Sequence, residues 1–128
     1  MILDTSAIVA QFLSEPGSKV IEAKLEVAKS IAIGAPTLTE LGVVLWSKFR
    51  QNPMPRIARF QEMYRVTVVP FSDAHWREAV SAFERFGRGR HPAGLNFGDC
   101  FSYATAKLSN RPLLCVGNDF SKTDLLIA

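Results

Sequence analysis

Four acidic residues stand where a carboxylate can either complete a structural element or do chemistry. Asp4 directly follows an apolar N-terminal run, and Asp119 closes a Gly-Asn-Asp turn that also follows an apolar run. Glu40 has the spacing of a capping box with Thr37, three residues earlier, and Asp99 falls in the first turn of a predicted helix. Each has an ordinary structural explanation, so none predicts a functional site by itself.

The elements that must position these acids alternate between short apolar strands and helices. We expect strands at residues 1–3, 31–33, 66–69 and 113–116, with a short final strand possible at 125–127. We expect helices at about 6–13, 18–28, 37–49 and 55–64, from the cap at Ser72 to about 86, and at 97–108. This alternation predicts an α/β fold with a short central parallel sheet and helices on both faces. Because there is no repeat or linker, we expect one domain over residues 1–128.

In a parallel sheet the carboxyl ends of the strands share one edge, where ligands bind. Asp4 and Asp119 follow strands at that end, and Glu40 and Asp99 lie at the beginnings of helices that start there, so the four should face one rim. Like charges gathered so closely would force some groups to protonate unless a cation neutralised them. Oxygen ligands without His or Cys suit Mg²⁺ or Mn²⁺, which can activate a water for attack on a phosphate. The pattern predicts a metal-dependent phosphodiesterase site.

Four segments carry a resemblance to a known family. They are MILDTSA at 1–7, the pair Thr39-Glu40, LNFGDCFSYA at 95–104 and PLLCVGNDF at 112–120. With these segments the chain resembles the PIN-domain ribonucleases, and most closely the VapC-type toxins of bacterial toxin–antitoxin pairs. The likeness extends over essentially the whole chain, and the segment around Asp99 is its most specific part.

The resemblance implies a toxin that is an Mg²⁺-dependent endoribonuclease, with Mn²⁺ as a possible substitute. It would hydrolyse structured RNA, such as tRNA or rRNA, with a metal-activated water. The resemblance also implies a homodimer and a VapB-like antitoxin partner. The implied metal ligands and catalytic residues are Asp4, Glu40, Asp99 and Asp119, with Asp4 and Asp99 the firmest, and the implied supporting residues are Thr5, Ser6 and Asn118.

A Gly- and Arg-rich stretch at residues 87–94 lies just before Asp99. A solvated flexible loop is the ordinary explanation of such a stretch. Because the loop should border the acidic rim, and because arginine suits phosphate, we interpret it as a clamp for the RNA backbone. The residues assigned to this clamp are Arg85, Arg88, Arg90 and His91.

Composition excludes several classes of protein. The 128 residues are 48% apolar and carry a net charge of +3, which excludes a disordered chain and permits nucleic-acid binding. No apolar run is long enough to span a bilayer, and the N-terminus has no basic leader, so we expect a cytoplasmic protein without a membrane partner. Cys100 and Cys115 are expected as reduced core thiols. If the four acids form a site of charge −4, the rest of the chain carries +7.

Two other functions compete with the ribonuclease. One is a catalytically silent PIN-like module whose acidic pocket docks a basic partner peptide, which metal-binding measurements would distinguish from an enzyme. The other is a haloacid-dehalogenase-like phosphatase, whose chemistry needs a second Asp two residues after the first. Because position 6 is Ser, we set the phosphatase aside.

Overall fold

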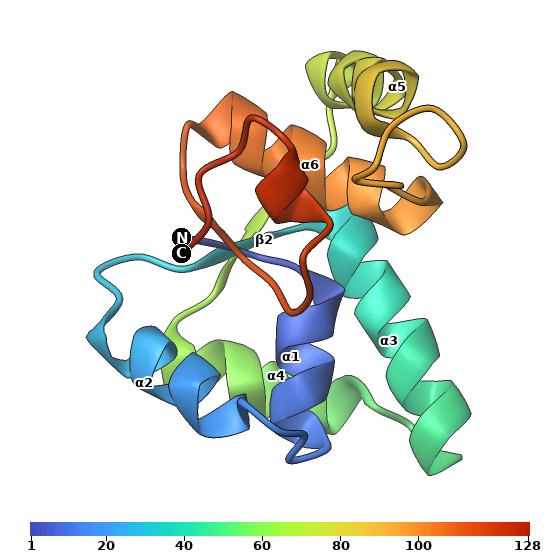
Figure 1. Cartoon of the computed structure of the whole chain (residues 1–128). Helices are drawn as coiled ribbons and strands as arrows, with labels where there is room; N and C mark the ends of the chain where they lie inside the picture. The colour runs from blue at the N-terminus through green and yellow to red at the C-terminus, as the bar shows by residue number, and fades with distance from the viewer.

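The computed structural model describes all residues from Met1 to Ala128. One parallel sheet of four short strands lies at the centre of the molecule, and Figure 1 labels its strand β2 between the two groups of helices. The strand order is β3-β2-β1-β4, and every neighbouring pair is parallel. The strands are β1 (Ile2–Leu3), β2 (Ala32–Gly34), β3 (Thr67–Val69) and β4 (Leu113–Leu114).

Six α-helices and one short 3₁₀ turn connect the strands. None of the helices combines the length and apolar character needed to cross a bilayer. The helices are α1 (Thr5–Phe12), α2 (Ser18–Val27), α3 (Ala35–Phe49), α4 (Met54–Tyr64), α5 (Asp73–Phe86) and α6 (Phe97–Ser109), and the 3₁₀ turn is η1 (Phe120–Lys122).

Two apolar layers form on the two faces of the sheet, because successive strand residues point to opposite sides. On β1, Leu3 packs in a cluster that includes Ile8 of α1 and Leu41 of α3. Its neighbour Ile2 packs in a second cluster with Tyr103 of α6. Figure 1 shows α1, α2 and α4 on one side of the sheet and α5 and α6 on the other. The predicted fold class is therefore confirmed.

The strands are shorter than the sequence suggested. β4 ends at Leu114 instead of residue 116, and β2 is shifted by one residue to Ala32–Gly34. The segment 125–127 forms no strand of its own, and only an isolated bridge joins Ile127 to Leu113. The residues after Leu114 are therefore free to leave the sheet and form the turn that carries the last acid.

The predicted start of the helix at Thr37 is wrong. α3 begins at Ala35 with Gly34 as its N-cap, and Pro36 occupies the first turn, where proline fits without losing a hydrogen bond. Thr37 is thus inside the helix and completely buried, so it does not form a capping box with Glu40. A capping box with Thr37 therefore does not explain the position of Glu40.

Candidate functional site: an acidic edge of the sheet

Asp4 ends β1 and caps the helix that follows. Its Oδ2 accepts hydrogen bonds from the backbone N–H of Ser6 at 2.9 Å and from the Ser6 hydroxyl at 2.5 Å. The Ser6 oxygen in turn accepts the backbone N–H of Val116, just beyond β4, at 2.9 Å. Asp4 is only 4% exposed, and its Oδ1 receives no hydrogen bond from the protein. Asp4 therefore caps α1 with one carboxylate oxygen, while its other oxygen has no protein donor.

Glu40 reaches the same edge from the second turn of α3. Its Oε2 accepts a hydrogen bond from the Thr5 hydroxyl at 2.6 Å. On its other side lies Gly98, where a Cβ atom would come within 2.5 Å of Glu40 Oε1. Glu40 is therefore held between the start of α1 and the start of α6.

Asp99 lies in the first turn of α6, where a reciprocal capping box fixes it. Asn96 Oδ1 accepts the Asp99 backbone N–H at 2.9 Å, and Asp99 Oδ2 accepts the Asn96 backbone N–H at 2.8 Å. Neither Asn96 nor Gly98 was singled out from the sequence. The Asn-x-x-Asp spacing, a capping box with Asp in place of Glu, was a usable signal for Asn96.

Asp119 is the exposed member of the group and lies directly before η1. Its side chain forms no hydrogen bond or ion pair. The backbone carbonyl of its neighbour Asn118 accepts the Ser121 hydroxyl at 2.8 Å, which closes the turn. The Asn118 side chain forms no hydrogen bond to the other acids, so its supporting role stays a prediction.

The four carboxylates are close enough to influence one another. Burial, together with the charges of Asp4, Asp119 and Glu40, raises the pKa of Asp99 to about 6 against the lowering effect of the Asn96 N–H. None of the four forms an ion pair with a lysine or arginine, because all three ion pairs of the chain lie elsewhere. The edge is thus a concentration of negative charge without a counter-cation from the protein.

This fold and this acidic edge can be set beside known proteins. The family model described as the PIN domain matches residues 1–126. The chain belongs to the PIN-domain family. The resemblance proposed from the sequence is thereby confirmed.

Relatives of this PIN domain are named as ribonucleases. Ribonuclease VapC36 of Mycobacterium tuberculosis is 44% identical over 128 residues, which cover 98% of this chain and 91% of the relative. Ribonuclease VapC42 of the same species is 37% identical over 126 residues, which cover 98% of this chain and 96% of the relative. These matches confirm the predicted enzyme class, a ribonuclease of the VapC type.

Solved structures share the fold at low sequence identity. VapC20 of Mycobacterium tuberculosis, described as a sarcin-ricin loop cleaving toxin, aligns with a TM-score of 0.79 at 14% identity over 99% of this chain and 97% of that one. A toxin–antitoxin complex from Klebsiella pneumoniae gives a TM-score of 0.72 at 20% identity, over 99% of this chain and 95% of its own. The architecture is therefore that of VapC toxins.

A divalent metal, which the family implies, fits the donor chemistry of this PIN domain. The available ligands are carboxylate oxygens with no thiolate or imidazole among them, as Mg²⁺ and Mn²⁺ prefer. The oxygens Asp4 Oδ1, Glu40 Oε1 and Asp99 Oδ1 receive no hydrogen bond from the protein. As placed, however, no three His, Cys, Asp or Glu side chains form a preassembled metal-binding group. The four carboxylates thus have the chemistry of Mg²⁺ ligands, whereas their side chains are not already arranged around one metal position.

The residues assigned to the RNA clamp have different surroundings in this PIN domain. The Arg85 guanidinium forms an ion pair with Asp124 at 2.9 Å, and His91 Nδ1 accepts the Ala93 backbone N–H at 3.1 Å. Arg90 lies over the Phe83 ring at 5.8 Å, and Arg88 is exposed with no side-chain partner. Arg88 and Arg90 are therefore the better placed of the four to meet a phosphate.

Neither cysteine of the PIN domain is an activated nucleophile. Cys100 and Cys115 are free thiols, and burial raises the pKa of each to about 11. At neutral pH both are protonated. Cys100 is buried, as expected of a core thiol, whereas Cys115 is half-buried at the margin of the core.

Proposed function

We propose that this PIN domain is a metal-dependent endoribonuclease acting as the toxin of a VapBC-like toxin–antitoxin pair. Its substrate would be structured RNA such as tRNA or rRNA. The observation that carries the proposal is the group of four carboxylates without a protein counter-cation at the carboxyl edge of a parallel sheet. Relatives named as ribonucleases support it.

The acidic residues have distinct roles in this proposal. Asp4 and Asp99 hold the metal, which when bound supplies an activated water and stabilises the leaving oxygen. Ser6 fixes the orientation of Asp4 by donating to Oδ2, which leaves Oδ1 for the ion. Thr5 does the same for Glu40 by donating to Oε2, so that Glu40 acts as a ligand directly or through a water.

Cleavage by the purified protein tests this proposal. The wild-type chain should cut total RNA in Mg²⁺ and lose that activity in EDTA, while Asp4→Asn and Asp99→Asn should each lower the rate at least about 100-fold, since each removes a charge that binds the ion. Circular dichroism checks that the variants are folded. Asp73→Asn is the matched control, because Asp73 is an exposed aspartate paired with Arg77 on α5. Cleavage by either site variant at the wild-type rate would show that the site is assigned wrongly.

The absence of a preassembled metal group gives the silent interaction module a specific basis. Calorimetry separates the two functions without using RNA. The ribonuclease should bind Mn²⁺ through the acidic edge, and Asp99→Asn should weaken that binding. A chain that binds neither Mg²⁺ nor Mn²⁺, and whose thermal stability EDTA leaves unchanged, would be the silent module.

The antitoxin, in this proposal, binds the apolar groove between α3 and α4. This groove has a volume of about 900 Å³, and Trp46, Val43 and Met54 expose 54%, 63% and 72% of their surface at its walls. The solved structure from Klebsiella pneumoniae that shares this fold is a toxin–antitoxin complex. Trp46→Glu should weaken the complex with the antitoxin at least about tenfold in calorimetry, because it places a charge on the docking face. An unchanged Kd would exclude the groove.

Self-association, in this proposal, uses the second apolar face, between α5 and α6. Phe97, Val80 and Trp76 are 79%, 61% and 46% exposed there, around a hollow of about 490 Å³ lined only by apolar residues. Light scattering should find a homodimer that Val80→Glu converts to a monomer. A monomeric wild-type chain would contradict the homodimer.

A further inference from the structure

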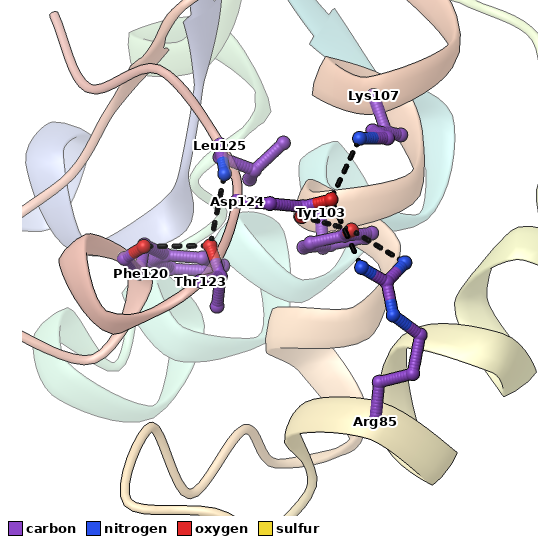
Figure 2. A network of polar contacts seen from close by, with 7 residues as sticks. All are labelled: Arg85, Tyr103, Lys107, Phe120, Thr123, Asp124 and Leu125. Carbon is purple, nitrogen blue, oxygen red and sulfur yellow. Dashed lines mark hydrogen bonds and ion pairs between the residues drawn. The ribbon is translucent and has the colours of Figure 1, made fainter.

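Asp124 is held by three donors from two different helices. Its Oδ1 accepts the Tyr103 hydroxyl at 2.5 Å, and its Oδ2 accepts Lys107 Nζ at 2.8 Å and Arg85 Nη2 at 2.9 Å. Figure 2 shows these four side chains converging, with Arg85 arriving from α5 and the other two from α6. A carboxylate with three such donors is a firm attachment point, although each ion pair is partly exposed.

The segment attached at Asp124 is the one that carries Asp119. Between these two residues lies η1, whose Phe120 is 4% exposed in the apolar cluster beneath α6. The Thr123 hydroxyl donates to the Phe120 carbonyl at 2.6 Å, and the Thr123 backbone N–H binds the same carbonyl at 3.0 Å. The Lys122 N–H donates to the Asp119 carbonyl at 3.2 Å. Hydrogen bonds within residues 119–123 thus hold the turn together, so restraining Asp124 also restrains Asp119.

The hydrogen bond between Asp124 and Tyr103 connects this segment to α6, the helix that carries Asp99. Tyr103 lies one helical turn after Asp99 on α6, and it is completely buried, so its ring and the N-terminus of α6 form one rigid unit. Asp119 and Asp99 repel each other, and neither forms an ion pair with a lysine or arginine. Without a restraint, this repulsion would push the exposed turn away from the helix.

We propose that Asp124 is a positioning residue, which through Tyr103 and Lys107 holds the turn bearing Asp119 against the helix bearing Asp99. In this way a residue outside the acidic group sets the separation of two of its members and so the strength of metal binding. The inference rests on the proposed function, because it requires that Asp119, as one of the four carboxylates of that proposal, contributes to metal binding.

Metal binding and amide hydrogen exchange of the full chain test this inference. Asp124→Asn should weaken Mn²⁺ binding in calorimetry about tenfold and raise the Mg²⁺ concentration for half-maximal cleavage by a similar factor, with kcat at saturating Mg²⁺ within about twofold of wild type. Asp124→Asn should add nothing in an Asp119→Asn background, because its effect passes through Asp119. In the metal-free protein the amides of Lys122 and Thr123 should exchange faster.

Two variants keep the result interpretable. Tyr103→Phe removes one hydrogen bond to Asp124 and keeps the buried ring, so it should shift metal binding in the same direction if Asp124→Asn fails to fold. Asp73→Asn breaks an exposed aspartate–arginine pair away from this turn and should leave metal binding unchanged.

Wild-type Mn²⁺ affinity in Asp124→Asn, or full additivity with Asp119→Asn, would overturn the inference while leaving the ribonuclease intact. If the wild-type chain binds no metal, the proposed function fails instead. In that case the exchange measurement still decides the attachment, since unchanged exchange at Lys122 and Thr123 in Asp124→Asn would overturn it.

Discussion

Asp4 and Asp99 each use one carboxylate oxygen to cap a helix and leave the other without a protein donor. The capping role that the structure shows and the metal-binding role that we propose are therefore compatible, because they concern different atoms. The cap fixes the carboxylate in one orientation, and an Asn substitution keeps an oxygen for the cap while removing the charge. Such variants separate chemistry from folding.

A first prediction concerns the pH dependence of stability. Burial and three neighbouring carboxylates raise the pKa of Asp99 to about 6 in the folded, metal-free chain. An unfolded aspartate titrates near about 3.9, so the contribution of Asp99 to stability is complete below that pH and is lost as the pH rises through about 6. Asp99→Asn removes this pH-dependent loss. In EDTA its Tm should exceed that of wild type by on the order of 5 °C at pH 8, and the difference should shrink toward pH 4.

Differential scanning calorimetry at the two pH values measures this. A Tm of Asp99→Asn below that of wild type at pH 8, or a difference independent of pH, would contradict the charge repulsion inferred at the acidic edge.

A second prediction concerns Gly98. A Cβ at this position would meet Glu40 Oε1 at 2.5 Å, and the flexible Glu40 side chain would move away from Thr5 Oγ1. Gly98→Ala should therefore lower the cleavage rate about tenfold, because the displaced Glu40 carboxylate no longer serves the site; a tenfold loss corresponds to about 1.4 kcal/mol of transition-state stabilisation. Gly42→Ala is the matched control, because its Cβ would approach Ile57 no closer than 3.9 Å. Equal rates in both variants would show that Glu40 placement is unimportant.

At the scale of elements, the acids come together at the carboxyl edge of the sheet, where three of them follow β1, β2 and β4 and the fourth is supplied by α6. β1 and β4 run side by side in parallel, so Asp4 and the turn before Asp119 leave the sheet at one edge, and the Ser6–Val116 hydrogen bond joins them. The helices α3 and α6 contribute their N-terminal turns to the same edge. Four separate elements therefore supply one carboxylate each.

A third prediction concerns the Gly- and Arg-rich loop after α5. Arg88 and Arg90 are exposed, so replacing both with Ala should weaken RNA binding and reduce its salt dependence, by a slope of about 0.7–0.9 for each phosphate that is no longer neutralised. Arg85 is engaged by Asp124 instead, so Arg85→Ala should lower stability by about 1 kcal/mol. RNA affinity measured from about 50 to 200 mM salt checks the first effect, and urea unfolding checks the second. An unchanged slope in the double variant would exclude the clamp.

The sequence was sufficient for the parallel sheet and for the grouping of the acids, because both follow from alternating patterns and from strand ends. It did not predict the start of α3, since the spacing of Thr37 and Glu40 favoured Thr37 as the N-cap, whereas the helix begins at Ala35 with Gly34 as its N-cap. Nor did it predict that Arg85 pairs with Asp124, because that contact joins residues 39 positions apart. Contacts of this range depend on how α5, α6 and the C-terminal segment pack, which no local pattern encodes.

At the scale of the whole molecule, the net charge of +3 conceals two opposite fields. Four acids at one edge carry −4, and the remaining residues carry +7. A surround of this sign would attract a polyanion to the site that we propose to hold divalent cations. This distribution of charge agrees with a nuclease of the VapC type.

The measurement that tests the central claim most directly is the mapping of RNA 5′ ends after brief expression of the chain in cells. Wild type should produce a small set of new 5′ ends in tRNA or rRNA, and Asp99→Asn, expressed at the same level and folded, should produce none of them. The same new ends in both strains, or none in either, would contradict the assignment of the acidic edge as a ribonuclease centre.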